Sequence, residues 1–344
     1  MGKCYFRNGR IVGEEEQPYF IAEVNTSHYG KIDKAIELID AARESGCDCV
    51  KFQSWTAESL YSKTYYEENP FAKRMVSRFA LSESDLFELA QYCNKRGIGF
   101  SSTPYSTKEV DFLVDECCAP FVKIASMDLD NDAFLKYIAK KDVAIVLSTG
   151  MSTYEEVVHA VNVLEGNGAK NLCLLHCVSV YPPDGEDIRL KNIEELKRRF
   201  PQYAIGFSDH SMGQEMSCAA VALGASVIEK HLTMDSKKIG MDNQMATEPQ
   251  MMRELVENCC RIYDALGGNE RIISKKEEEM RVKMRRSLIA KIDIEEGTIL
   301  TEKMIDAKRP GTGLPLCMKE KIIGKCVNRR IDADTVIYRE DVDL

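Results

Sequence analysis

The sequence predicts an α/β protein in which parallel strands alternate with helices, followed by a small β-rich unit. Three observations support this prediction. Eight short β-rich runs recur along about 250 residues, amphipathic helical stretches separate them, and the character of the chain changes after residue 268. Strands that alternate with helices form parallel sheets with right-handed crossovers.

The eight runs have the length and composition of buried strands. They cover residues 19–24, 49–53, 99–104, 121–126, 144–150, 172–178, 204–209 and 227–232. Apolar residues recur every three or four positions in the intervening stretches, for example over 31–45, 82–96, 153–166 and 212–223. Eight such units predict a TIM (β/α)8 barrel. A doubly wound open sheet is the alternative, but no G-x-G-x-x-G turn follows the first strand.

Both ends of the predicted barrel carry further elements. Residues 4–12 have the pattern of a hairpin that turns at Asn8-Gly9, and such a hairpin would cap the bottom of the barrel. Gly267 and Gly268 precede a charged stretch, and short strands and tight turns follow it. We therefore expect a catalytic barrel over residues 1–268, a linker over 269–284 and a small, mostly β domain over 285–344.

Composition excludes several classes of protein. The formal net charge of −9 argues against nucleic acid as the main partner. No apolar run approaches the roughly 20 residues that cross a bilayer, and the N-terminal segment lacks the apolar region of a signal peptide. The 13 cysteines show no zinc-binding spacing, so we interpret them as reduced thiols. These observations predict a cytoplasmic protein without a membrane or nucleic-acid partner.

Polar residues gather at the carboxyl ends of the predicted strands, where TIM barrels place their active sites. They include Glu23, Lys51, Gln53, Thr103, Lys123, Ser126, Ser148, His176, Ser179, Ser208, His210, Glu229 and His231. Residues two apart in a strand point to the same face, as do Glu229 and His231. We therefore expect two lysines, several hydroxyl groups and three histidines to converge on one cavity.

These residue types favour particular ligands. Two lysines with Ser and Thr hydroxyls suit a phosphate or a carboxylate. His210 and His231 fall on neighbouring strands, and two imidazoles beside the carboxylate of Asp242 can hold a divalent cation. The alternative is that each is an ordinary hydrogen-bonded core histidine.

A series of motifs now connects the chain to a known family. In order they are KFQ (51–53), STP (102–104), KIAS (123–126), STGM (148–151), LLHC-x-S-x-YP (174–182), GFSDH (206–210), EKHLT (229–233) and KRPGTG (308–313). The chain resembles the sialic acid synthase (N-acetylneuraminate synthase) family, which includes the legionaminic and pseudaminic acid synthases, over nearly its whole length. The resemblance implies a TIM barrel followed by a small domain similar to type III antifreeze protein, called an SAF domain.

The resemblance also implies an activity. Family members condense phosphoenolpyruvate with an N-acetylated mannosamine-type sugar aldehyde, and they release phosphate by C–O cleavage. They use a divalent metal, which would be Mn²⁺, Mg²⁺ or Co²⁺. They form domain-swapped homodimers, which would carry Arg309 of the small domain into the neighbouring subunit's site.

Roles follow from the matching motifs. The implied catalytic residues are Glu23, Lys51, Lys123, Asp128 and Glu229. The implied phosphoenolpyruvate-binding residues are Lys51, Thr103, Lys123, Ser126, Ser148, Ser179 and Ser208. The implied sugar-binding residues are Glu23, Gln53, Tyr181, Asp242 and Arg309. The implied metal ligands are His210 and His231.

Two segments on the sugar side depart from the family pattern. The family commonly has N-H-N-G after the Glu of the first strand and P-G-P-D-H after the last strand. Here Thr26–Tyr29 and Ile239–Asn243 differ, although His28, Gly30 and Asp242 remain. The alternative acceptor is therefore a 2,4-diacetamido-trideoxy sugar, as in legionaminic or pseudaminic acid synthesis.

Two other functions compete with these. One is phosphoenolpyruvate condensation with a phosphorylated sugar on another TIM barrel. The KRPGTG motif argues against it, and so does the shortage of further Arg or Lys for a second phosphate. The other is a non-catalytic sugar-binding barrel. The retained His pair, the two lysines and Asp242 argue against it.

Overall fold

The computed structural model describes residues 2–344, which divide into two compact units. The first ends at Gly267 and the second begins at Gly268. The linker expected over residues 269–284 contains helix α13 (Lys275–Met284) and belongs to the second unit.

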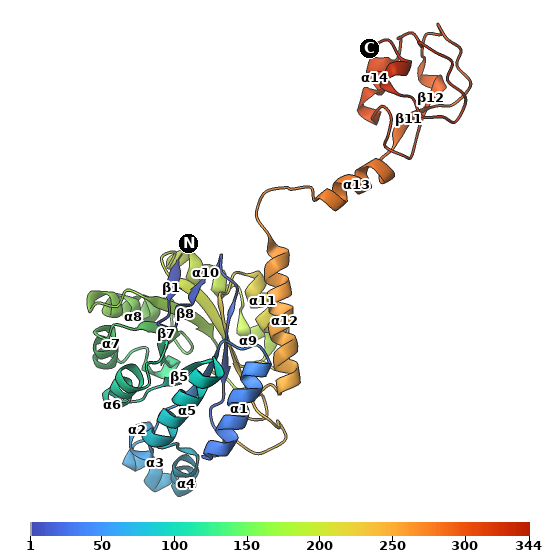
Figure 1. Cartoon of the computed structure of the whole chain (residues 1–344). Coiled ribbons are helices and arrows are strands. Elements are labelled where there is room, and N and C mark those ends of the chain that lie inside the picture. The colour runs from blue at the N-terminus through green and yellow to red at the C-terminus, as the bar shows by residue number, and fades with distance from the viewer. Residues whose placement is uncertain (1) are drawn as a thin grey trace. The chain divides into compact units, whose positions relative to one another are not determined.

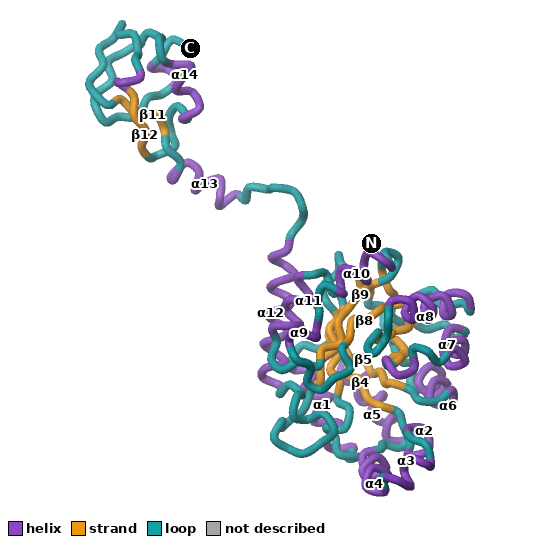
Figure 2. Tube along the Cα trace, turned by 180° about the vertical axis from the view of Figure 1, so that it is seen from behind, coloured by secondary structure: helices purple, strands orange, loops and turns teal. Residues whose placement is uncertain are grey.

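Eight parallel strands form the centre of the first unit (Figures 1 and 2). They are β3 (Tyr19–Glu23), β4 (Cys49–Gln53), β5 (Gly99–Thr103), β6 (Phe121–Ile124), β7 (Ala144–Ser148), β8 (Leu172–Cys177), β9 (Ala204–Asp209) and β10 (Val227–His231). The first strand, β3, pairs with the last, β10. Strands β5 and β6 stand at the two ends of the strand order. Ser101 Oγ on β5 donates to the Phe121 carbonyl oxygen on β6 at 2.9 Å, and this bond closes the barrel. The predicted (β/α)8 barrel is confirmed.

Helices surround the strands, purple around orange in Figure 2. They are α1 (Ile32–Glu44), α5 (Glu83–Arg96), α6 (Thr107–Asp111), α7 (Asp132–Ala139), α8 (Tyr154–Gly166), α9 (Gly185–Ile188), α10 (Asn192–Arg199), α11 (Glu215–Ala222) and α12 (Pro249–Leu266). A capping box between Thr153 and Glu156 sets the start of α8. Helix α11 begins three residues later than predicted, because Gly213 has a φ of +75° that a right-handed helix cannot include.

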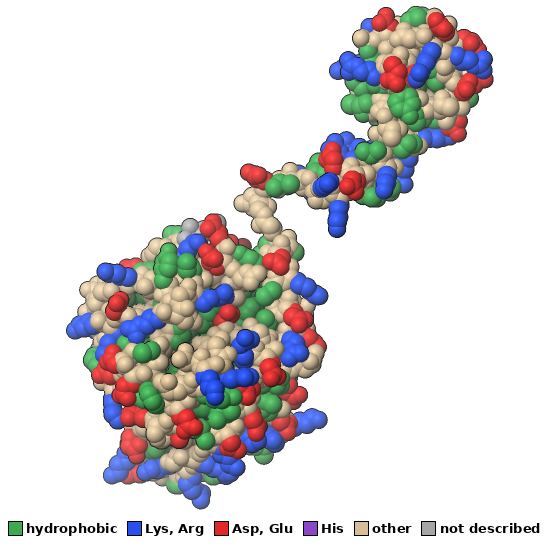
Figure 3. All heavy atoms as spheres, in the orientation of Figure 1, with side chains coloured by type: hydrophobic (Ala, Val, Ile, Leu, Met, Phe, Trp, Pro, Cys, Tyr) green, Lys and Arg blue, Asp and Glu red, His purple; other side chains and the backbone are tan. Residues whose placement is uncertain are grey.

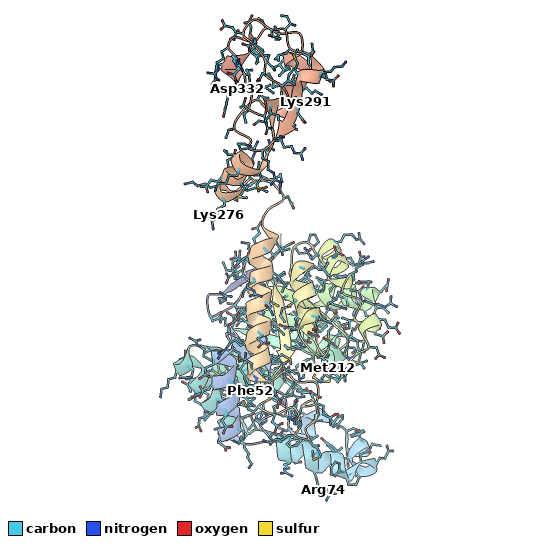
Figure 4. All side chains as sticks on the ribbon, turned by 90° about the vertical axis from the view of Figure 1, so that its right-hand side faces the viewer. Phe52, Arg74, Met212, Lys276, Lys291 and Asp332 are labelled. Carbon is cyan, nitrogen blue, oxygen red and sulfur yellow. The ribbon has the colours of Figure 1, made fainter. Side chains whose placement is uncertain are left out.

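An additional helical segment lies between β4 and α5. It contains α2 (Ala57–Leu60), α3 (Lys63–Glu68) and α4 (Pro70–Phe79). Figure 4 shows Arg74 projecting outward from it, away from the strands. Leu60 and Tyr61 of this segment line a cavity at the carboxyl ends of the strands.

Alternation along the strands separates two apolar layers of the barrel. Outward residues such as Val50 and Phe52 pack in one cluster with the helices, whereas the inward Cys49 packs in the barrel interior. The hairpin of β1 (Lys3–Tyr5) and β2 (Ile11–Gly13) closes the amino-terminal end, as predicted. Its Phe6 ring lies 4.8 Å from the ring of Phe121, between centroids. The lower interior is therefore apolar and filled.

The second unit has a core of its own. After α13, it contains β11 (Ser287–Ala290) paired antiparallel with β12 (Ile305–Lys308), and the short helix α14 (Lys319–Ile322). Leu288, Ile305 and Ile322 are buried in one cluster within it. Helix α13 contributes no buried residue, which agrees with its charged sequence.

Acidic and basic side chains are interspersed over the face of the protein that Figure 3 shows. Among residues 2–344, no helix has both the length and the apolar character to cross a membrane.

Replacing Gly206 with Ala should destabilise the barrel, because the added Cβ would lie 2.6 Å from both the Leu175 Cδ2 atom and the Val227 carbonyl oxygen. Overpacking of a filled core costs about 1 to 3 kcal/mol of unfolding free energy. Urea unfolding followed by the fluorescence of Trp55, the only tryptophan, measures this in the barrel itself.

Gly166→Ala is the matched control, since an added Cβ there meets nothing within 4 Å. It should leave stability unchanged or slightly raise it. Equal stability of Gly206→Ala and wild type would show that this interior is not filled.

Candidate active site

A cavity of about 360 Å³ lies at the carboxyl ends of the barrel strands. Most of the residues that the sequence singled out line it: Glu23, Lys51, Gln53, Thr103, Lys123, Ser126, Ser148, Ser179, Tyr181, Ser208, His210, Glu229, His231 and Asp242. All eight strands or the loops directly after them contribute. The structure therefore brings most of the predicted residues into one place.

Two lysines and two glutamates form an ion cluster at the floor of this cavity. Lys51 pairs with Glu23, and its Nζ lies 3.8 Å from Glu229 Oε2. Lys123 Nζ lies 3.8 Å from Glu229 Oε1. All four side chains are at most 5% exposed. Charged groups persist in such an interior only when they compensate one another.

The cluster separates the proton affinities of its two carboxyl groups. Burial raises the pKa of Glu23, and the nearby Glu229 carboxylate adds to that effect. Burial also opposes ionisation of Glu229, but the ammonium groups of Lys123 and Lys51 outweigh it and lower its pKa. Two neighbouring carboxyl groups whose pKa values move apart can divide acid and base roles.

Burial lowers the pKa of Lys123, whereas the Glu229 and Glu23 carboxylates overcome burial and raise that of Lys51. Lys51 is therefore the more firmly charged of the two.

Hydroxyl groups complete the floor. Lys123 Nζ donates to Ser148 Oγ at 2.7 Å, and Lys51 Nζ donates to Thr103 Oγ1 at 3.0 Å. Ser208 Oγ donates to Glu229 Oε1 at 2.9 Å. Ammonium groups flanked by rotatable hydroxyls can bind the oxygens of a phosphate or carboxylate.

Two imidazoles lie beside this floor. The ring centroids of His210 and His231 are 5.3 Å apart, and His231 Nδ1 lies 3.7 Å from Asp242 Oδ2. His210 Nδ1 donates to the Val178 carbonyl oxygen at 2.8 Å, which leaves Nε2 as its free ligand atom. Burial, with the nearby His210, lowers the pKa of His231 well below its usual value, so this ring stays neutral.

The residues fit a divalent ion in part. Neutral imidazole is the form that binds metals. Among residues 2–344, however, no group of three His, Cys, Asp or Glu side chains has metal-binding geometry. A metal here would take further ligands from substrate or water, which is the open arrangement of catalytic sites.

Some predicted residues lie elsewhere. His176 faces the helices, and its Nε2 donates to the Ile188 carbonyl oxygen at 2.6 Å. Together with His210 and His231 it was expected in the cavity, so the prediction of three converging histidines is wrong. Asp128 accepts a hydrogen bond from Asn131 Nδ2 at 3.1 Å and does not line the cavity.

Arg309, the remaining predicted sugar-binding residue, belongs to the second unit.

The comparison with protein families matches residues 38–271 to the NeuB family and residues 285–343 to the SAF domain. The first match covers more than half of the chain. The chain belongs to the NeuB family. This confirms the resemblance that the motifs indicated, including the SAF domain after the barrel.

Relatives within the family are similar over nearly the whole chain. The N,N'-diacetyllegionaminic acid synthase of Campylobacter jejuni is 38% identical over 328 residues, which cover 92% of this chain and 98% of that protein. The human N-acetylneuraminate-9-phosphate synthase is 34% identical over 351 residues, which cover 97% of this chain and 95% of that protein. The solved structure of the sialic acid synthetase of Leptospira borgpetersenii superposes with a TM-score of 0.74 at 30% identity, covering 81% of this chain and 96% of that one.

This NeuB-family chain has cavity residues that the sequence analysis missed. Apart from Asn25, Ala125 and Cys177, they form an apolar and aromatic rim of Trp55, Leu60, Tyr61, Tyr105, Met127, Met151 and Met241. Tyr105 directly follows the STP motif, and its hydroxyl donates to Gln53 Oε1 at 2.7 Å. Gln53 Nε2 in turn donates to Glu23 Oε1 at 3.1 Å. Trp55 lies two residues after the KFQ motif and Tyr105 directly follows STP, and this proximity was the signal that the sequence offered.

The two segments that depart from the NeuB-family pattern contact each other. Ser27 Oγ donates to Asn243 Oδ1 at 3.1 Å, and the Met241 backbone N–H donates to Thr26 Oγ1 at 3.3 Å. Asp242, between the two contacts, lines the cavity. The two departures are therefore hydrogen-bonded to each other rather than separate changes, and the second of them lines the cavity through Met241 and Asp242.

Barrel stability should fall in acid partly through His28, which is 2% exposed. Its Nδ1 accepts a hydrogen bond from the Gly30 N–H at 3.0 Å, and burial lowers its pKa to about 4. The unfolded chain binds a proton near pH 6.5 and the folded one does not. The stabilisation is therefore full above pH 6.5 and is lost as pH falls toward 4.

His28→Gln keeps an acceptor without the titration. Between pH 7.5 and 4.5, wild type should lose on the order of 2 to 3 kcal/mol more unfolding free energy than this variant. Urea unfolding followed by Trp55 fluorescence at both pH values tests it, and parallel losses would assign the acid sensitivity to other groups.

Proposed function

We propose that the chain condenses phosphoenolpyruvate with the aldehyde of an N-acetylated mannosamine-type sugar to give a sialic-type nonulosonic acid and phosphate. The single observation that carries this is the cluster of Lys51 and Lys123 with hydroxyl groups, beside His210 and His231 in one cavity. Membership of the NeuB family, whose relatives are named as synthases of such acids, supports it.

The floor suits the donor substrate. Phosphoenolpyruvate carries a carboxylate and a phosphate, and the predicted cradle offers two ammonium groups with five hydroxyls. Lys51 and Lys123 would hold these anions and stabilise charge on the phosphate as its C–O bond breaks. The hydroxyls of Ser126, Ser148, Ser179, Ser208 and Thr103 would orient them.

The carboxyl groups suit the proton transfers. The enol carbon of the donor attacks the aldehyde carbon, the cation that develops at C2 takes up water, and the tetrahedral intermediate expels phosphate, which takes the proton of the C2 hydroxyl as the ketone forms. The aldehyde oxygen gains a proton and the attacking water loses one. Glu23, with its raised pKa, would supply the first, and ionised Glu229 would accept the second. Asp128, which lies off the cavity in this structure, would act only after the loop that carries it moves.

His210 and His231 would hold the divalent ion, Mn²⁺, Mg²⁺ or Co²⁺, and Asp242 would orient a bound water or the sugar. When bound, the ion supplies Lewis-acid polarisation of the aldehyde.

The acceptor side favours a second candidate, a 2,4-diacetamido-trideoxy sugar. Tyr181, Gln53 and Asp242 offer polar contacts, but the rim of the cavity is aromatic and methionine-rich. Such a rim suits N-acyl methyl groups and deoxygenated carbons. The joined departures at Thr26–Ser27 and Met241–Asn243 support a changed acceptor.

We further propose a cytoplasmic homodimer in which Arg309 of one copy completes the sugar site of the other. The 13 free cysteines support a reducing compartment. The SAF domain that carries Arg309 folds around its own core, which a swapped arrangement requires.

Phosphate release from phosphoenolpyruvate tests the reaction class. We expect release only when both an amino-sugar aldehyde and Mn²⁺ are present, and EDTA should abolish it. N-acetylmannosamine and 2,4-diacetamido-trideoxy hexoses form the panel, and kcat/KM ranks them. No release with any sugar would move the assignment to a non-catalytic sugar-binding barrel.

Lys123→Ala should lower kcat by about 100- to 1000-fold, because it removes a preorganised cation from the departing phosphate. Lys140→Ala, on the exposed surface, is the control and should match wild type. Near-normal turnover of Lys123→Ala, measured as phosphate release at saturating substrates, would remove this lysine from the mechanism.

A further inference from the structure

A buried ion pair lies directly behind the two imidazoles. Asp209 and Lys230 are register partners on β9 and β10, and they immediately precede His210 and His231. Their side chains are 0% and 1% exposed, and Lys230 Nζ donates to Asp209 Oδ2 at 2.8 Å. Neither lines the cavity, because strand alternation turns them toward helix α11.

The pair holds the turn after β9. Asp209 Oδ1 accepts from the backbone N–H and the Oγ of Ser211, at 2.8 and 2.6 Å. Lys230 Nζ donates to the Ser211 carbonyl oxygen at 2.6 Å. Ser217 Oγ on α11 donates to Asp209 Oδ2 at 2.6 Å. Every polar group of Ser211, the residue after His210, is therefore bonded to this pair.

The position of the pair in the sheet adds to its importance. The β9–β10 ladder ends at Asp209 and Lys230, so His210 and His231 lie just past its last paired residues. His231 is itself paired with Glu23 on β3, so backbone pairing fixes the position of His231 but not that of His210, which follows the end of β9. The ion pair is the last direct link between the strands before them. Met212, labelled in Figure 4, continues the same turn.

Packing alone does not require charge here. Phe207 and Ile228 occupy the preceding outward positions of the same strands and pack in the apolar layer. A buried ion pair is often no more stabilising than apolar residues of similar size. What it adds is directional bonds, and in this protein they converge on Ser211.

We propose that Asp209 and Lys230 are a positioning pair that fixes the spacing of His210 and His231, and thereby the divalent-ion site. The inference rests on the metal site in the proposed function. The pair touches neither substrate nor metal and acts through the two imidazole residues.

Binding of Mn²⁺ to the full-length double variant Asp209→Leu/Lys230→Met tests this inference. The apolar pair can pack between β9, β10 and α11, but it cannot hold Ser211. We expect the Mn²⁺ dissociation constant, measured by electron paramagnetic resonance of free Mn²⁺, to rise at least about tenfold. The KM for phosphoenolpyruvate should stay near wild type, because Lys51 and Lys123 are unchanged, and excess Mn²⁺ should restore turnover.

Ile228→Ala is the matched control. Ile228 lies on the same face of β10, is 1% exposed, and packs in the same apolar layer. Its truncation should lower the melting temperature but leave Mn²⁺ affinity unchanged. Ser211→Ala, which removes the hydroxyl bond to Asp209 and keeps the ion pair, should weaken Mn²⁺ binding less, and it serves if the double variant does not fold.

The outcomes separate the two hypotheses. Wild-type Mn²⁺ affinity in the folded double variant would overturn the positioning role and leave the proposed function intact. The same holds if Ile228→Ala weakens Mn²⁺ binding as much as the double variant does. If the double variant does not fold, wild-type affinity in Ser211→Ala overturns it. Absence of Mn²⁺ binding to the wild-type chain would remove the metal from the proposed function, and the positioning role with it.

Discussion

Two ammonium groups inside a closed barrel are the constraint on which the rest of the site depends. Lys51 and Lys123 are 2% and 3% exposed, and an uncompensated charge at that depth would be strongly destabilising. Glu23 and Glu229 offset them, so the floor is close to neutral. An anionic ligand competes with these carboxylates for the same cations, and its arrival favours the protonated form of Glu23. Ligand binding and proton uptake are thereby coupled by the geometry of the floor.

The barrel and its floor could be predicted from the sequence because strands impose a period of two. The parity that turns Lys51 inward with Cys49 also turns His176 outward, since its neighbours Leu175 and Cys177 face the interior. The prediction that His176 enters the cavity was wrong because nearness to a strand end does not set the direction of a side chain, whereas the strand period does. Asp128 is a different case, because it follows the strand in a short 3-10 turn whose direction the strand period does not set.

The rim could not be predicted in the same way. Tyr61 and Met241 reach the cavity from loops and short helices, whose course depends on tertiary packing rather than on local pattern. The same division separates the floor from the rim. The lysines, glutamates and hydroxyls of the floor lie on strands, whereas the rim residues lie on loops and short helices. Because Thr26 and Ser27 bond to Met241 and Asn243, substitutions in these two segments are expected to be coupled, although the segments lie more than 200 residues apart in the sequence.

The hairpin beneath the barrel has a consequence for kinetics. Phe6 and its neighbours fill the amino-terminal end, so the cavity opens at one end only. The lysines lie at its floor, while Tyr181 and Met241 at the rim are 49% and 46% exposed. An occupant of the rim blocks the way to the floor. In the proposed reaction, phosphoenolpyruvate at the floor would therefore enter before the sugar, and a sugar that bound first would be a dead-end inhibitor that competes with phosphoenolpyruvate.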